Sequence, residues 1–372
     1  RFPCVQLFEI INGMPDKSDK ALSKAVQKKA YASRLPSLKT ELTELLLDSL
    51  SAFHTGQRAA FTIRRMVTQA ELVYTKGLYT HCLKRLKRAE KKAQQTEQHR
   101  ALGDILALRR SLLVIKQLGE SFGTDMDQLY GEIQQTLRYI QSTVDYRKLM
   151  DRMQVVSSQY VQVPAGDVEN ELSNILGNPL LLDEESTISF DAYLARYSTL
   201  GISALLIGNS EQARRHYAEA IDLWKKRPHL IADRISQYRR YLFNYLNCLI
   251  ALPYHDDFAT TIRDIRMLPP QTTDIRLGGR CELWYIELLY YLNRGRLEQG
   301  GAVVQEIQKD LSEEIQRSDP LTVLALYYNC SIWCFFTGRH ASALEYLNKL
   351  LHAQNEGIKS DMYSFARELA II

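Results

Sequence analysis

The residues of this sequence best suited to metal or redox chemistry are its cysteines. Cys330 and Cys334 are four residues apart, so a helix places both thiols on one face, where two further ligands would complete a zinc site. No histidine or other cysteine lies near them at a zinc-finger spacing, and we interpret the pair as small buried thiols without a metal. The cysteines lie mostly within apolar helical patterns and no Cys-x-x-Cys pair occurs, so we interpret them as small buried thiols in a reducing compartment. The cysteines are Cys4, Cys82, Cys248, Cys281, Cys330 and Cys334.

No motif in the sequence places a nucleophile beside a base. We find no glycine-rich phosphate loop, no His-Glu-x-x-His and no Gly-x-Ser-x-Gly. The histidines are scattered, and His255-Asp256-Asp257 is typical of a turn rather than a ligand set. The sequence therefore predicts a protein without catalytic residues, cofactor or metal. An enzyme with an unrecognised site is the weaker alternative.

A basic helix over 79–95 is the second candidate for binding chemistry. Its charges could contact phosphates or an acidic partner, but no aromatic residue is interleaved to stack on bases. We therefore favour a solvated outer face over a nucleic-acid site. Residues 1–150 hold 25 Lys+Arg against 15 Asp+Glu, a net charge of +10, while the remainder is net −6. The basic residues are Lys84, Arg85, Lys87, Arg88, Lys91 and Lys92.

The elements that carry these residues are predicted to be helices. Only 10 of 372 residues are proline, and no period-two pattern with hairpin turns indicates strands. Asp16 and Ser18 are candidate caps for a helix over 18–33, and Pro36 begins another. That helix carries an apolar stripe at helical spacing. The stripe consists of Leu38, Leu42, Leu45, Leu46 and Leu50.

A pattern of large and small residues recurs in the second half of the chain. Gly208, Asp256, Gly295 and Gly338 mark its expected turns, where glycine adopts a left-handed conformation without a Cβ penalty. Small residues such as Gly201 would let paired helices approach closely. This spacing resembles the tetratricopeptide repeat (TPR) family, although the turns are 39–48 residues apart and the usual period is about 34. Segments 35–39, 77–84 and 361–367 are similar to an uncharacterised TPR family from Bacteroidota.

The resemblance implies an all-α fold, a right-handed α–α superhelix with a more irregular helical N-terminal half. Residues 1–163 would form that half, with one TPR-like hairpin at about 63–96. Residues 164–189 would form a linker that retains a short helix around 167–176. Residues 190–372 would form the repeat array, whose units are 194–227, 242–275, 281–314 and 324–357, followed by a final helix.

In TPR proteins the first helix of each unit lines a concave groove, and the matching positions here, which include Ala195, are mostly apolar or aromatic. No lysine or asparagine stands there, which argues against binding of a peptide carboxylate. The pattern predicts a hydrophobic peptide or an amphipathic helix as ligand, or a groove filled by the protein's own N-terminal helices. The candidate groove residues are Ile202, Leu246, Ile250, Tyr285, Leu289, Tyr328, Ile332 and Phe335.

Two functions of different classes remain open at this point. The first is a non-enzymatic interaction scaffold that binds a peptide or amphipathic helix of a partner protein. The second is a peptide-sensing regulator whose basic N-terminal half contacts nucleic acid. We favour a nucleic-acid partner less than a protein partner. No stretch approaches the ~18 apolar residues of a membrane span and no signal peptide is recognisable, so we expect a cytoplasmic protein. Self-association is left open.

Overall fold

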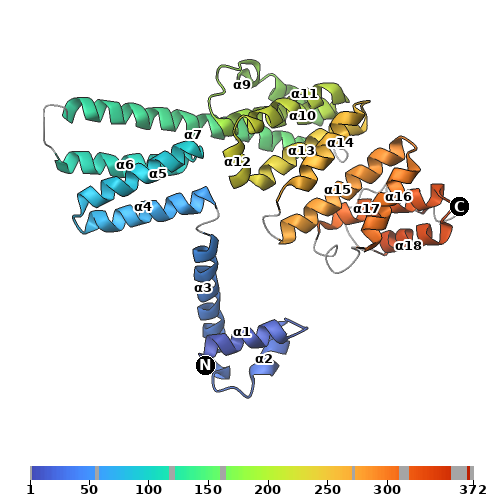
Figure 1. The fold of residues 1–372 in the computed structure, drawn as a ribbon, viewed down its shortest axis with the longest axis horizontal. Coiled ribbons are helices and arrows are strands. Elements are labelled where there is room, and N and C mark those ends of the chain that lie inside the picture. The colour runs from blue at the N-terminus through green and yellow to red at the C-terminus, as the bar shows by residue number, and fades with distance from the viewer. Residues whose placement is uncertain are drawn as a thin grey trace. The chain divides into compact units, whose positions relative to one another are not determined.

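The computed structural model describes residues 2–54, 58–116, 122–159, 165–269, 273–309, 318–352 and 367–368. Every regular element in these ranges is helical, so the predicted all-α class is confirmed (Figure 1). No helix in the same ranges is both long and apolar enough to cross a membrane. The chain forms two compact units, Arg1–Arg138 and Tyr139–Ile372, and the division between them falls within helix α7.

The first unit contains two separate apolar cores. Helices α1 to α3 enclose one core around Leu7, Val26 and Leu38. Helices α4 to α6 and the first part of α7 enclose the other, around Ile63, Leu86 and Ile105. The elements are α1 (Pro3–Gly13), α2 (Asp19–Val26), η1 (Ala32–Arg34), α3 (Leu35–His54), α4 (Ala59–Thr75), α5 (Tyr79–Gln95), α6 (His99–Lys116) and α7 (Phe122–Gln159).

The second unit is built largely from neighbouring helices that pack side by side, α10 against α11 and α17 against α18 among them. Its largest core lies around Trp224, Leu246 and Tyr290. The elements are α8 (Ala165–Leu176), α9 (Pro179–Leu182), α10 (Phe190–Leu206), α11 (Ser210–Lys225), α12 (Pro228–Asp233), α13 (Ile235–Ile250), α14 (His255–Met267), α15 (Thr273–Asn293), α16 (Leu297–Lys309), α17 (Pro320–Phe336) and α18 (His340–Leu351).

The expected helix around 167–176 is present as α8, and α9 follows it. Ile175 and Leu181 of these two helices are buried with Tyr146 of α7 and Ala192 of α10. The Tyr146 hydroxyl donates to the Leu180 carbonyl at 2.7 Å. The segment 164–189, interpreted as a linker, therefore contains helices that pack into the second unit. The final helix expected after residue 357 lies outside the described residues except at 367–368.

The same turn ends the first helix of several hairpins. Gly77, Gly208, Gly295 and Gly338 all have φ between 63° and 78°, as predicted for the three that the repeat pattern marked as turns. At each, the glycine N–H bonds the carbonyl three residues back and the next N–H bonds the carbonyl five residues back. These paired bonds define a Schellman motif, which satisfies helix-terminal carbonyls. Each glycine thus reverses the chain into the second helix.

A fifth copy of this turn joins α5 to α6, where the sequence pattern showed none. Glu97 has φ 54°, and the N–H groups of Glu97 and Gln98 bond the carbonyls of Gln94 and Ala93. The turn was missed because glutamate, rather than glycine, occupies the left-handed position. A side chain there costs conformational energy that glycine avoids.

The predicted turn at Asp256 is wrong. Asp256 lies in the first turn of α14, and it is not among the described residues with positive φ. The chain instead leaves α13 through residues 251–254, which include Pro253, whose ring fixes φ in the negative range. A carboxylate is favourable at Asp256 because it faces the positive end of the helix dipole.

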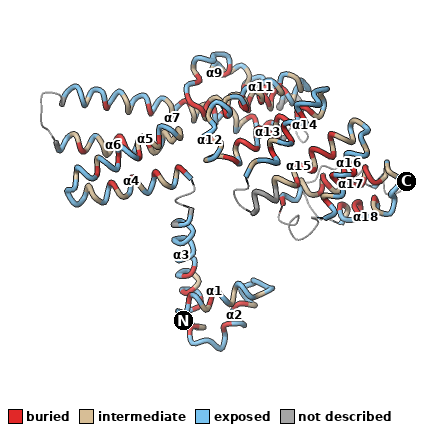
Figure 2. The backbone as a smooth tube through the Cα atoms, viewed as in Figure 1, coloured by how far each residue is buried: buried red, intermediate tan, exposed pale blue. Residues whose placement is uncertain are grey.

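Close approach of paired helices depends on small residues, as predicted. A Cβ at Gly201 would lie 2.7 Å from the ring of Tyr217, which is buried against α10. A Cβ at Gly301 would lie 2.9 Å from the Trp333 ring. Figure 2 shows the buried residues along the lines where helices meet.

The stripe predicted along α3 divides into two parts. Ser18 caps α2 and Pro36 lies in the first turn of α3, as expected, although α2 ends at Val26 rather than near 33. Leu38 and Leu42 are buried beneath α1 and α2. In contrast, Leu45, Leu46 and Leu50 are exposed, because α1 and α2 cover only the first half of this helix.

The left-handed turn can be tested with two matched substitutions in the first unit. A Cβ meets nothing within 4 Å at either Gly77 or Gly103, so the two sites differ chiefly in φ. Gly77→Ala should lower the local unfolding free energy of α4–α6 by about 1–2 kcal/mol, the cost of a left-handed alanine. Gly103→Ala, within helix α6, should raise it by about 0.5–1 kcal/mol. Amide hydrogen exchange of α4–α6 measures both, and equal effects would contradict the assignment.

Candidate functional site

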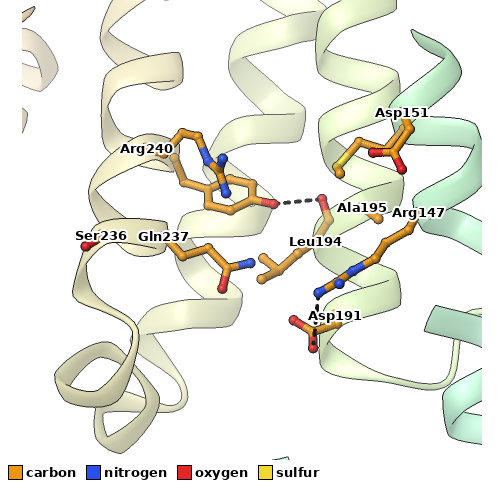
Figure 3. A pocket seen from close by; sticks show the side chains of 10 residues that line it. Arg147, Asp151, Asp191, Leu194, Ala195, Ser236, Gln237 and Arg240 are labelled. Atoms are coloured by element: carbon orange, nitrogen blue, oxygen red, sulfur yellow. Dashed lines mark hydrogen bonds and ion pairs between the residues drawn. The ribbon is translucent and has the colours of Figure 1, made fainter. Parts of the chain in front are cut away.

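A cleft of about 550 Å³ opens between helices α7, α10 and α13 of the second unit. Figure 3 shows side chains from three separate helices around it. Helix α10 provides the apolar side chains Leu194 and Ala195, while α7 and α13 provide mostly charged and polar ones. The lining residues are Arg147, Met150, Asp151, Asp191, Leu194, Ala195, Ser236, Gln237, Arg240 and Tyr241.

A chain of hydroxyl hydrogen bonds holds α13 against α10 at the cleft. The Ser198 hydroxyl donates to the Tyr241 oxygen at 3.0 Å, and Tyr241 donates to the Leu194 carbonyl at 3.1 Å. Burial raises the pKa of Tyr241 to about 12, so its hydroxyl keeps its proton at neutral pH. Tyr241 therefore acts as a fixed donor that orders the cleft rather than as a base.

The Asp191 carboxylate connects α10 with α7 and with Arg234, the residue that precedes α13. It lies in the first turn of α10, where the helix dipole favours negative charge. The Arg234 guanidinium donates to Asp191 at 3.0 Å, and Arg147 of α7 approaches the other carboxylate oxygen at 3.8 Å. The Arg147 side chain is 47% exposed and Asp191 only 18%, so Asp191 is the more firmly held.

Arg240 on α13 is exposed at the cleft. Among the described residues its guanidinium has no hydrogen bond or ion pair. Its charge lowers the pKa of Glu282, but less than the charge of Arg239 does, and burial raises that pKa overall. The cleft therefore offers guanidinium, carboxylate and amide groups over an apolar surface, a composition suited to holding a ligand.

The eight candidate groove residues are spread over four helices and none of them lines this cleft, although the further groove position Ala195 does. Ile202 lies on α10, Ile250 on α13 and Tyr285 on α15, and all three are half-buried. Leu246 is completely buried within a core, which leaves it no surface for a ligand. The remaining four, Leu289 of α15 and Tyr328, Ile332 and Phe335 of α17, are half-buried.

Sequence reasoning missed the polar residues of the cleft. Ala195 was recognised as a groove position, but Arg147, Asp191 and Arg240 were not. Arg147 belongs to α7, whose sequence lacks the repeat pattern, so nothing indicated that it meets α10 and α13. For Asp191 one signal was available. Serine is a preferred N-cap residue, and an acidic residue shortly after it, as Asp191 follows Ser189, is typical of a helix start.

The predicted basic residues share one solvent-facing side of α5. Lys84, Arg85, Lys87, Arg88 and Lys91 are exposed, and Lys92 is half-buried. Glu90 does not neutralise this face, because it accepts a hydrogen bond from Arg109 of α6 at 2.8 Å. The structure therefore places these charges on one face of α5, as their spacing predicts.

The cysteine pair lies in the interior. Cys330 and Cys334 on α17 are buried beside Trp333 and Tyr346. Burial raises the pKa of both thiols, which keeps them protonated and weakly reactive. Within the described residues, no three histidine, cysteine or acidic side chains gather as metal ligands.

Comparison of the chain with protein-family models and with curated proteins finds no match.

Removal of the Tyr241 hydroxyl tests the link between α10 and α13. Tyr241→Phe should lower the unfolding free energy of the second unit by about 1–2 kcal/mol, because a buried carbonyl loses a donor. The control is Tyr193→Phe, whose hydroxyl has no hydrogen bond in the described ranges. Tryptophan fluorescence in urea reports this unit alone, because the three tryptophans are Trp224, Trp284 and Trp333. Equal losses in the two variants would contradict the proposed role.

Proposed function

We propose that this chain is a non-enzymatic scaffold of TPR-like hairpins that binds a peptide segment of a partner protein. The observation that carries the proposal is the cleft between α7, α10 and α13, which combines apolar surface with exposed charge. Side chains of this kind hold a peptide through several directional contacts without reacting with it. The fixed proton on Tyr241 supports binding rather than acid–base chemistry at neutral pH.

Recurrence of one hairpin turn supports the assignment to a repeat architecture. The turns at Gly208, Gly295 and Gly338 share the same hydrogen bonds, and the hairpins that they form include α10–α11 and α17–α18. We further propose that these hairpins stack as a right-handed superhelix, the arrangement in which each repeat contacts its neighbours and binds ligands along one face. The cleft would occupy part of that face.

A photo-crosslinking amino acid in the cleft tests the scaffold function directly. Placed at Gln237, which lines the cleft, it should yield a defined adduct with a partner protein in cells that produce the chain. Placed at Ala259, an exposed residue of α14, it should not. Mass spectrometry identifies the adduct. The proposal fails if neither position gives an adduct or if both give the same one.

A second proposal rests on the exposed basic face of α5, namely that the N-terminal half contacts nucleic acid. Phosphate contacts by lysine and arginine weaken steeply as salt rises. If this function holds, the wild type is retained by double-stranded DNA at low salt, and reversal of Lys84, Arg85, Lys87 and Arg88 to glutamate abolishes retention. Absence of retention by the wild type contradicts it, and the face is then a solvated one.

A further inference from the structure

The two arginines of the cleft come from different walls. Arg147 projects from α7 and Arg240 from α13, with the α10 residues Leu194 and Ala195 between them (Figure 3). Both guanidiniums are accessible from solvent, since the Arg147 side chain is 47% exposed and Arg240 is also exposed. A group bound above α10 would therefore meet a cation on each side.

The carboxylates around the cleft leave these cations incompletely paired. Asp191 is shared between Arg234 and Arg147, and Arg147 has the longer contact, 3.8 Å against 3.0 Å. Asp151, on the same helix as Arg147, is exposed and makes no ion pair or hydrogen bond with another described residue. Glu282 faces Arg239 as well as Arg240. The lining holds two arginines, Arg147 and Arg240, and two carboxylates, Asp151 and Asp191. Of these arginines, Arg147 has only the long contact to Asp191, and Arg240 has no ion pair with a described residue.

We propose, on the basis of the scaffold function above, that the cleft binds an acidic side chain within the partner's segment between Arg147 and Arg240. Guanidinium groups bind carboxylates through paired, directional hydrogen bonds. Leu194 and Ala195 provide apolar surface for the methylene groups of that side chain, and the Gln237 amide adds a donor and an acceptor. This ligand differs from the hydrophobic peptide that the repeat pattern predicts.

The test uses the full chain and fluorescein-labelled octaglutamate, with octaglutamine as the uncharged comparison. At low ionic strength, fluorescence anisotropy should show binding of octaglutamate and little binding of octaglutamine. Arg147→Gln combined with Arg240→Gln should weaken octaglutamate binding about tenfold or more, because two charge-assisted contacts are lost. Both side chains are solvent-accessible, and circular dichroism verifies that the variant folds.

The matched control is Lys225→Gln combined with Lys226→Gln, which removes two exposed charges from the end of α11, in the same unit but outside the cleft lining. This variant should bind octaglutamate within about twofold of the wild type, since neither side chain lines the cleft. Equal weakening in both variants would show that octaglutamate binds through nonspecific charge attraction, and would overturn the proposal. Equal affinity for octaglutamate and octaglutamine would also overturn it.

Competition with inorganic phosphate distinguishes a peptide-binding site from a site for a free anion. At matched ionic strength, phosphate should not displace octaglutamate at concentrations comparable to those of the peptide, and full displacement would contradict a peptide ligand. Failure of the acidic-ligand proposal can be distinguished from failure of the scaffold function. If the Gln237 adduct forms and persists in the Arg147/Arg240 variant, the scaffold stands and the acidic ligand is wrong.

Discussion

Four of the described hairpins, α4–α5, α10–α11, α15–α16 and α17–α18, depend on a residue that can adopt a left-handed backbone conformation where their first helix ends. The Schellman bonds at Gly77, Gly208, Gly295 and Gly338 satisfy carbonyls that would otherwise lack partners and reverse the chain within about three residues. Because the reversal is short, the second helix must pack along the first. Small residues such as Gly201 then set how closely the two helices approach.

Packing between neighbouring hairpins is reinforced by side chains that donate to backbone carbonyls. The guanidinium of Arg294, the residue that directly follows α15, donates to the Ile250 carbonyl at the end of α13, at 2.8 Å. The Trp333 indole of α17 donates to the Leu297 carbonyl at 2.8 Å, at the start of α16. Tyr241 makes the corresponding contact from α13 to α10. Of these contacts, the one made by Tyr241 joins two of the helices that form the cleft, α10 and α13.

The sequence predicts features of this fold that depend on a single residue type. Glycine at a positive φ and a small residue opposite Tyr217 can be recognised because few other residues fit there. The Glu97 turn and the Asp256 helix position could not be recognised, because glutamate tolerates a strained turn and aspartate suits both turns and helix starts. The cleft was hidden for another reason. Arg147, Asp191 and Arg240 lie on three helices up to 93 residues apart, and each is an ordinary surface residue by itself.

The central claim is that a partner segment lies across α7, α10 and α13. Amide hydrogen exchange with and without the partner identified at Gln237 tests it most directly, because Asp191 in the first turn of α10 and Gln237 in the first turn of α13 both line the cleft. The account predicts slower exchange at the first turns of α10 and α13 and around Arg147. Protection confined to α5, or no protection at these three helices, would contradict it.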